Sequence, residues 1–220
     1  MDKFIFFDRD GVVNKRLVGD YVKSIEEFEF SDGFFGLFKS INEKGYKTAL
    51  ITNQQGVNKG IMTENELEIV HTFMQSELIK NTGFGFDYIK FSTDLDKTNS
   101  PRRKPALGMF IEVIEEHKAL NKIDIENSYM IGDSITDILP ANIIGLNTVF
   151  IGSNEEFEKQ KTLKYDKLKS EVEFIFSLSE NMKFIKNNTV DKNIEKNIFQ
   201  HNYIFESISS INNIVSLIFK

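Results

Sequence analysis

The chain has 220 residues and no cysteine, which excludes disulfides, thiolate nucleophiles, iron–sulfur clusters and zinc sites built from cysteine. Its 27 basic and 33 acidic side chains give a net charge of -6, which argues against a nucleic-acid partner because non-specific binding needs a basic surface. No apolar stretch approaches the roughly 18–20 residues of a membrane span, and the N-terminus turns polar at Asp8, too early for a signal peptide. We therefore expect a cytoplasmic protein with no membrane partner.

Short apolar runs alternate with longer helical patterns along most of the chain. The runs predict strands at residues 3–7, 46–51, 88–91, 128–131 and 147–151, with a weaker one at 171–176. Several are apolar on both faces, as strands of a parallel sheet are when helices cover both sides.

Between these runs, apolar residues spaced three and four apart predict helices at residues 34–41, 63–78, 105–114 and 135–144. Gly45 ends the first helix, Thr63 and Glu66 form a capping box for the second, and Pro105 is expected in the first turn of the third. The alternation predicts an α/β fold, a Rossmann-like open parallel sheet with helices on both faces.

The C-terminal part differs in composition. We assign residues 1–187 to one domain and residues 188–220 to a C-terminal helical extension. Apolar residues at helical spacing predict a single amphipathic helix over residues 203–219. We favour packing of this helix on its own domain; the alternative is a contact with a partner or a second copy, so the protein is expected to be a monomer or a homodimer.

Polar side chains gather where the predicted strands end. They are Asp8 and Asp10 after the first strand, Thr52, Asn53 and Gln54 after the second, Arg103 and Lys104 before the third helix, and Asp133 and Asp137 after the fourth strand. Because the carboxyl ends of parallel strands meet at one edge of a sheet, we expect these side chains to lie close together.

This set of groups suits phosphoryl transfer, which needs a nucleophile, a proton donor for the leaving oxygen and positive charge around the transferring group. Asp8 and Asp10, separated by a turn, can supply the nucleophile and the general acid. Mg²⁺ prefers oxygen ligands, and Asp133 adds a further carboxylate. Thr52 offers a hydroxyl donor and Lys104 a fixed positive charge.

Each of these residues alone also has a structural interpretation. Asp-Gly is a common turn, Ser134 and Asp137 can pair as a helix cap, and Thr52-Asn53 can be plain turn residues. The order of the whole set, with each member at a strand end, favours the catalytic interpretation.

The motifs resemble those of the capless phosphatases of the haloacid dehalogenase superfamily, and specifically the D-glycero-D-manno-heptose 1,7-bisphosphate phosphatase family with its histidinol-phosphate phosphatase relatives. The resemblance covers about residues 3–152 and is carried by Asp8-Arg9-Asp10-Gly11, the residues around Tyr21, Thr52-Asn53-Gln54, Arg103-Lys104-Pro105 and Gly132-Asp133. It implies a hydrolase of a small phosphorylated sugar, in the first place a heptose bisphosphate of lipopolysaccharide or capsule synthesis. The short connection after Asp10 leaves no room for a cap domain, and between Thr52 and Lys104 the predicted helix and strand account for most of the chain.

Carried over to this sequence, the resemblance implies that Asp8 attacks phosphorus and forms an aspartyl-phosphate, while Asp10 protonates the leaving oxygen and then activates water. Asp8, Asp133 and the backbone carbonyl of Asp10 are expected to hold Mg²⁺. Substrate contacts are expected from Tyr21, Asn53, Gln54 and Arg103, phosphoryl contacts from Thr52, Asn53 and Lys104, and indirect support from Asp137.

Residues 92–102 depart from the family pattern. Relatives carry a zinc-binding loop of Cys and His before Arg-Lys-Pro, whereas this segment contains neither residue type, so we expect no zinc. Two other functions stay open: a histidinol-phosphate or other small-metabolite phosphatase on the same scaffold, and a non-catalytic binding module.

Overall fold

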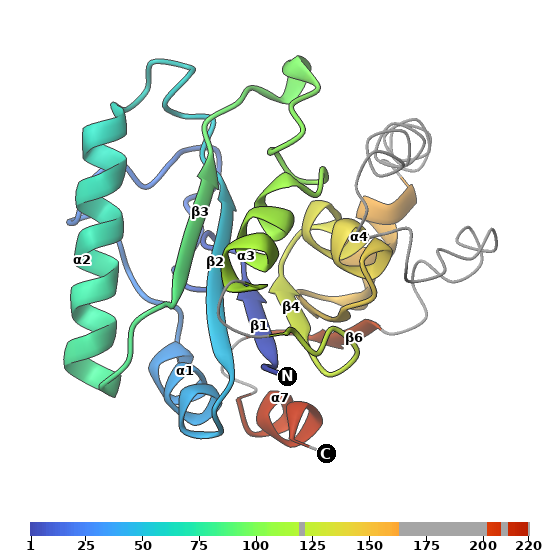
Figure 1. Cartoon of the computed structure of the whole chain (residues 1–220). Coiled ribbons are helices and arrows are strands. Elements are labelled where there is room, and N and C mark those ends of the chain that lie inside the picture. Colours follow the sequence, from blue (N-terminus) through green and yellow to red (C-terminus); the bar gives the residue numbers. More distant parts are fainter. Residues whose placement is uncertain (119–121, 163–201, 208–210, 220) are drawn as a thin grey trace.

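The computed structural model describes residues 1–118, 122–162, 202–207 and 211–219. A six-stranded sheet with the order β3-β2-β1-β4-β5-β6 lies between two layers of helices (Figure 1). All of its strands run parallel. The strands are β1 (Phe4–Phe7), β2 (Lys47–Asn53), β3 (Tyr88–Ser92), β4 (Tyr129–Gly132), β5 (Asn147–Ile151) and β6 (Asn202–Phe205).

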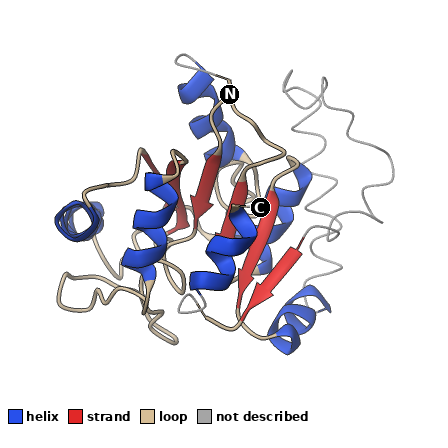
Figure 2. Cartoon of the chain, turned by 90° about the horizontal axis from the view of Figure 1, so that it is seen from below, coloured by secondary structure: helices blue, strands red, loops and turns tan. Residues whose placement is uncertain are grey.

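The helices cover both faces of this sheet (Figure 2). They are α1 (Phe34–Glu43), α2 (Glu64–Thr82), α3 (Gly108–Lys118), α4 (Ile135–Ile143) and α7 (Ile211–Ile218). Residues 154–162 are also helical, and a 3₁₀ turn, η1, spans Asp96–Thr98. Alternate residues of β1 point to opposite faces: Phe4 and Phe6 pack with α3 and α4, and Ile5 and Phe7 with α1, α2 and α7. The predicted α/β fold is confirmed, and the described residues contain no cap domain.

The predicted strands and helices up to residue 151 are all present, with ends shifted by a few residues. Both hydrogen bonds of the predicted Thr63–Glu66 capping box are present, because each side chain accepts from the backbone N–H of the other residue. Ser134 and Asp137 form a second capping box at the start of α4, so the structural interpretation of Asp137 is correct. This cap does not exclude a second role, because the other oxygen of Asp137 faces Lys104.

The predicted position of Pro105 in the first turn of a helix is wrong, since α3 begins only at Gly108. The preceding residues form turns instead: Ala106 N–H donates to Arg103 O at 2.8 Å, and Gly108 N–H donates to Pro101 O at 2.8 Å. These turns carry the Lys104 backbone past the end of β2 before the helix starts.

The predicted helix over residues 203–219 is also wrong. Residues 202–205 form β6, which pairs in parallel with β5, and the helix described in this range is the shorter α7. Ile204 packs on one face of the sheet and Phe205 on the other, an alternation that four residues are too few to reveal. The C-terminal segment is predicted to pack on its own domain. This is confirmed for α7, because Ile214 and Ile218 are buried.

Two of the predicted features lie outside the described residues. The weaker strand at residues 171–176 and the domain boundary between residues 187 and 188 both lie in the part of the chain that the structure does not describe. Within the described part, every helix is too short or too polar to cross a bilayer.

Ile214→Ala tests whether α7 belongs to the core. The side chain is fully buried, so its truncation is expected to lower the free energy of unfolding by about 2–5 kcal/mol. Ser216→Ala, at an exposed position of the same helix, is the matched control and is expected to change it by less than about 0.5 kcal/mol. Urea denaturation measures both; equal, small effects would mean that α7 does not pack as described.

Candidate active site

The ends of three central strands bring the predicted site residues to one edge of the sheet. Phe7 is level with Leu50 of β2 and with Ile131 of β4, and the Asp8 N–H donates to Ile131 O at 3.0 Å. Asp8 therefore lies beside the residues that follow β4, including Asp133. Gly11, at φ 96°, packs so closely that a Cβ there would overlap the Asp133 carboxylate.

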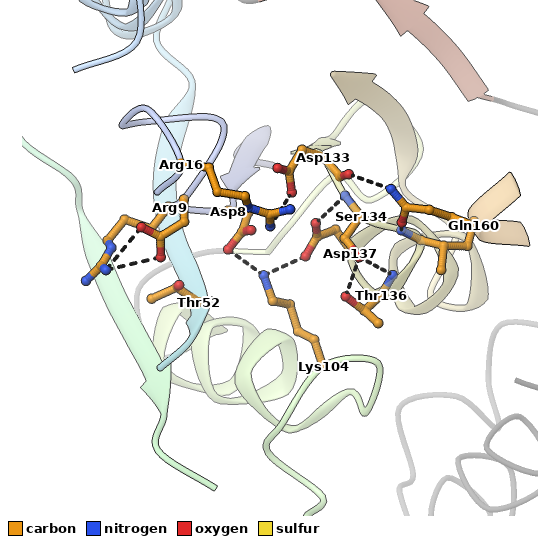
Figure 3. A network of polar contacts seen from close by, with 12 residues as sticks. Asp8, Arg9, Arg16, Thr52, Lys104, Asp133, Ser134, Thr136, Asp137 and Gln160 are labelled. Carbon is orange, nitrogen blue, oxygen red and sulfur yellow. Dashed lines mark hydrogen bonds and ion pairs between the residues drawn. The ribbon is translucent and has the colours of Figure 1, made fainter. Parts of the chain in front are cut away.

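Lys104 connects two of the carboxylates. Its buried Nζ donates to Asp8 Oδ1 at 2.8 Å and to Ile51 O at 2.7 Å, and it lies 2.6 Å from Asp137 Oδ1. Figure 3 shows the ammonium group between the two aspartates. A buried charge is tolerated when it is paired and hydrogen-bonded, and Lys104 meets both conditions.

The pKa values of these groups reflect their burial and crowding. Burial alone would lower the pKa of Lys104, but the charges of Asp137 and Asp8 outweigh it and raise the pKa. Burial, with the negative charge of Asp8, raises the pKa of Asp137 to about 6 and the pKa of Asp133 well above its usual range. Additional positive charge at this position would relieve the repulsion among the three carboxylates.

The donor set fits Mg²⁺, which prefers oxygen ligands. Carboxylate oxygens of Asp8, Asp133 and Asp137 lie within 4.8 Å of one another, but those of Asp137 face Lys104 and the Ser134 N–H. Asp8 and Asp133 are therefore the better ligands. The N–H groups of Val12, Val13 and Asn14 all donate to Arg9 O, which leaves the neighbouring Asp10 carbonyl outside these bonds.

The Asp10 carboxylate is held from behind by three side chains. Arg9 Nη2 lies 3.2 Å from Oδ1 and 3.1 Å from Oδ2, Asn14 Nδ2 donates to Oδ1 at 3.0 Å, and Gln54 Nε2 donates to Oδ2 at 2.8 Å. Burial would raise the pKa of Asp10, but the Arg9 charge and these hydrogen bonds together lower it. Asp10 is 24% exposed through its side chain and lines the cavity.

Gln54 does not have the position expected of a substrate contact. It is fully buried and is absent from the lining of the cavity. Its amide nitrogen bridges Asp10 and Thr52 Oγ1, the latter at 2.9 Å, so Gln54 orients two site residues from below. The sequence places Gln54 at the strand end but does not show which way its side chain points.

Asn53 and Arg103 shape the segment that carries Lys104. The Asn53 side chain donates to Lys104 O and accepts from Lys104 N–H, both at 2.9 Å. Arg103 Nη1 donates to Asp94 O at 3.1 Å, and its Nε lies 3.8 Å from Asp96 Oδ1. Both residues also line the cavity, so they remain available for contacts with a ligand.

The site opens into a cavity of about 1080 Å³ walled by the loops after β1, β2 and β3. Lys59 donates to the Tyr21 hydroxyl at 3.0 Å and lies over the Tyr21 ring, which ties the first two loops together. The basic side chains among the lining residues are Arg16, Lys59, Lys97, Arg103 and Lys104. A cavity with this lining can bind an anionic molecule larger than a single phosphate.

Two further contacts of Asp133 are absent from the sequence prediction. Arg16 Nη2 donates to Asp133 Oδ1 at 2.9 Å, and Gln160 Nε2 donates to Asp133 O at 3.2 Å (Figure 3). Both residues lie far from Asp133 along the chain, and neither occurs in a motif. Arg16 has one weak signal, its place in the short loop that follows the first pair of aspartates.

Comparison with known proteins agrees with this geometry. The HAD-hydrolase-like family model matches residues 101–172. The chain is 38% identical over 138 residues to the D-glycero-beta-D-manno-heptose-1,7-bisphosphate 7-phosphatase of Helicobacter pylori strain J99, covering 63% of this chain and 76% of that protein. It is 30% identical over 172 residues to the D-glycero-alpha-D-manno-heptose-1,7-bisphosphate 7-phosphatase of Campylobacter jejuni, covering 78% of this chain and 95% of that protein.

A solved structure has the same fold. It is the D,D-heptose 1,7-bisphosphate phosphatase of B. bronchiseptica, complexed with magnesium and phosphate, with a TM-score of 0.68 at 19% identity, covering 98% of this chain and 99% of the other. With the acidic and basic groups meeting at one sheet edge, these matches show that the chain belongs to the heptose-1,7-bisphosphate phosphatase family of the haloacid dehalogenase superfamily.

Proposed function

We propose that this protein is a Mg²⁺-dependent phosphatase that hydrolyses D-glycero-D-manno-heptose 1,7-bisphosphate at the 7-phosphate through an aspartyl-phosphate. The observation that carries the proposal is the convergence of Asp8, Asp10, Thr52 and Lys104 on one cavity, with Asp133 beside Asp8. These are a nucleophile, an acid, a hydroxyl donor, a cation and a metal ligand. Phosphoryl transfer requires these parts and little other covalent chemistry from the protein.

In the first step Asp8 attacks phosphorus. Lys104 engages Oδ1 of Asp8, so Oδ2 is the oxygen assigned to the attack, and the same ammonium group helps to neutralise the phosphoryl oxygens. Asp10 donates a proton to the sugar oxygen as it leaves, and then takes a proton from the water that hydrolyses the aspartyl-phosphate. Thr52 and Asn53 contact the phosphoryl oxygens.

Asp8, Asp133 and the Asp10 carbonyl are the groups that would hold Mg²⁺. When bound, the ion supplies positive charge for the phosphoryl oxygens and for the crowded carboxylates. Asp137 serves this arrangement indirectly, because its oxygens hold Lys104 and cap α4.

The cavity wall supports a substrate with a second phosphate. Besides Lys104 beside Asp8 and Arg16 beside Asp133, the basic residues Lys59, Lys97 and Arg103 line the cavity. Arg103 and Tyr21 are the residues proposed to contact the part of the sugar that does not react. The relatives act on different anomers according to their names, so both anomers belong in the test.

A phosphate-release assay tests the function. With Mg²⁺, we expect turnover of one or both anomers of D-glycero-D-manno-heptose 1,7-bisphosphate, with kcat/KM of about 10⁴ M⁻¹s⁻¹ or more, and at least tenfold slower turnover of histidinol phosphate. Excess EDTA is expected to remove the activity and added Mg²⁺ to restore it. Absence of phosphate release from every sugar phosphate tried, with folded protein and Mg²⁺, would overturn the proposal.

A further inference from the structure

The fully buried Arg9 lies behind Asp10 and has its own partner on a distant helix. One terminal nitrogen, Nη2, contacts the Asp10 carboxylate, and the other, Nη1, lies 3.3 Å from Nε2 of His71 on α2. The Arg9 Nε has no hydrogen-bond partner within the described residues. The orientation of the guanidinium group thus depends largely on Asp10 at one end and His71 at the other.

His71 has the chemical form that this contact needs. Burial, with the neighbouring Arg9 charge, lowers the pKa of His71 to about 3, so the ring is neutral at neutral pH. A guanidinium group only donates hydrogen bonds; His71 Nε2 therefore accepts, and the ring proton resides on Nδ1. The ring is buried and packs against Phe91 of β3 at a centroid distance of 5.5 Å, which fixes its position.

From these contacts we infer that His71 is a positioning residue, which accepts a hydrogen bond from Arg9 and through Arg9 holds the Asp10 carboxylate in the orientation for proton transfer. The inference rests on the role of Asp10 given under the proposed function. His71 touches no reacting atom; its effect passes through one buried side chain.

The other contacts of Asp10 do not make His71 redundant. Asn14 and Gln54 each engage one carboxylate oxygen, whereas Arg9 bridges both. Arg9 is thus the charged partner of Asp10 and the one that contacts both oxygens of the carboxylate plane. A general acid transfers its proton over a hydrogen-bond distance, so a turn of that plane slows the transfer without weakening substrate binding.

The leaving group gives a readout that a merely structural role would not change. A sugar alkoxide leaves poorly and needs the proton from Asp10, whereas 4-nitrophenolate leaves readily with little protonation. Loss of the correct Asp10 orientation therefore slows hydrolysis of a sugar phosphate more than hydrolysis of 4-nitrophenyl phosphate.

The experiment measures kcat and KM for both substrates in wild type, His71→Leu and His71→Gln. His71→Leu removes the acceptor, and we expect kcat for the sugar phosphate to fall about 10- to 100-fold, with KM within twofold and the aryl phosphate changed by less than threefold. His71→Gln retains an acceptor and is expected to restore kcat to within threefold of wild type.

Val70→Ala is the matched control, because Val70 is the neighbouring fully buried residue of α2. It removes packing from the same helix but no hydrogen-bond acceptor of Arg9, and it is expected to leave the ratio of the two kcat values unchanged. If His71→Leu does not fold, His71→Met replaces it, since the flexible thioether fills space but is only a weak acceptor.

Two kinetic results would overturn the inference while leaving the proposed function intact. One is a decrease in the kcat of His71→Leu that is equal for the sugar phosphate and the aryl phosphate. The other is a folded His71→Leu enzyme whose kcat for the sugar phosphate is unchanged. If wild type hydrolyses neither substrate, the proposed function fails. The positioning role of His71 is then tested by comparing the orientation of the Asp10 carboxylate in crystal structures of the wild type and the His71 variants. An Asp10 carboxylate oriented as in wild type would then overturn it, and a rotated one would support it.

Discussion

Asp8→Asn is expected to lower kcat for a sugar phosphate by at least about 10³-fold, because an amide cannot replace the carboxylate as the attacking group. The substitution keeps the size of the side chain and an oxygen that can accept from Lys104, so the fold should be retained. It also removes one of three crowded negative charges. The measurement is release of inorganic phosphate at saturating substrate with Mg²⁺ present.

Asp32→Asn is the control for this variant. Asp32 is another aspartate of the same chain, but its side chain is 81% exposed and its partner is Lys15 at 3.5 Å. We expect wild-type kcat from this control. An Asp8→Asn protein that keeps a tenth of the wild-type activity would show that Asp8 is not the nucleophile.

Lys104→Met is expected to lower the free energy of unfolding by about 3–5 kcal/mol at pH 7, the usual cost of removing one partner of a buried ion pair. The cost arises because Asp8 and Asp137 stay buried without the cation that lies within 2.8 Å of both. Methionine has nearly the length of lysine, so little volume is lost. The same variant is expected to lose at least about 100-fold in kcat, because Lys104 also faces the transferring phosphoryl group.

Two further variants separate the charge effect from packing. Lys90→Met removes a lysine whose partner, Glu116, is 54% exposed, and it is expected to cost less than about 1 kcal/mol. Adding Asp137→Asn to Lys104→Met removes one uncompensated carboxylate and should recover part of the lost stability. Urea denaturation measures all of these variants. A cost for Lys104→Met no larger than that for Lys90→Met would mean that the buried pair is not formed.

The position of the site could be predicted from the sequence because strand ends determine it. Asp8 and Asp133 each follow a short apolar run, and the parallel arrangement of β1 and β4 then places them side by side. That reasoning needs only the location of each strand and its direction. Small errors in the strand ends do not affect it.

The contacts behind the site could not be predicted, because they join residues that the sequence separates widely. Arg16 lies 117 residues from Asp133, and His71 lies 62 residues from Arg9. Neither pair has a local spacing rule. The side-chain direction of Gln54 could not be predicted for a different reason. Its location at the end of β2 follows from the sequence, but the direction of its side chain depends on the local course of the chain after β2.

The tail shows the limit of periodicity as a signal. Apolar residues at 204, 208 and 211 match one helical face. Residues 202–205 are nevertheless a strand, because they pair in parallel with β5. Pairing with a distant strand supplies backbone hydrogen bonds that a local pattern does not reveal.

The addition of β6 to β5 also has a consequence for biosynthesis. A ribosome adds about 5–20 residues per second, so residues 202–205 emerge some seconds after Ile151 completes β5. During that interval the nascent chain has a β5 edge whose eventual partner has not been translated, and such edges are templates for aggregation. The sheet is therefore completed only when residues 202–205 have been synthesised, well after the last of the catalytic motifs.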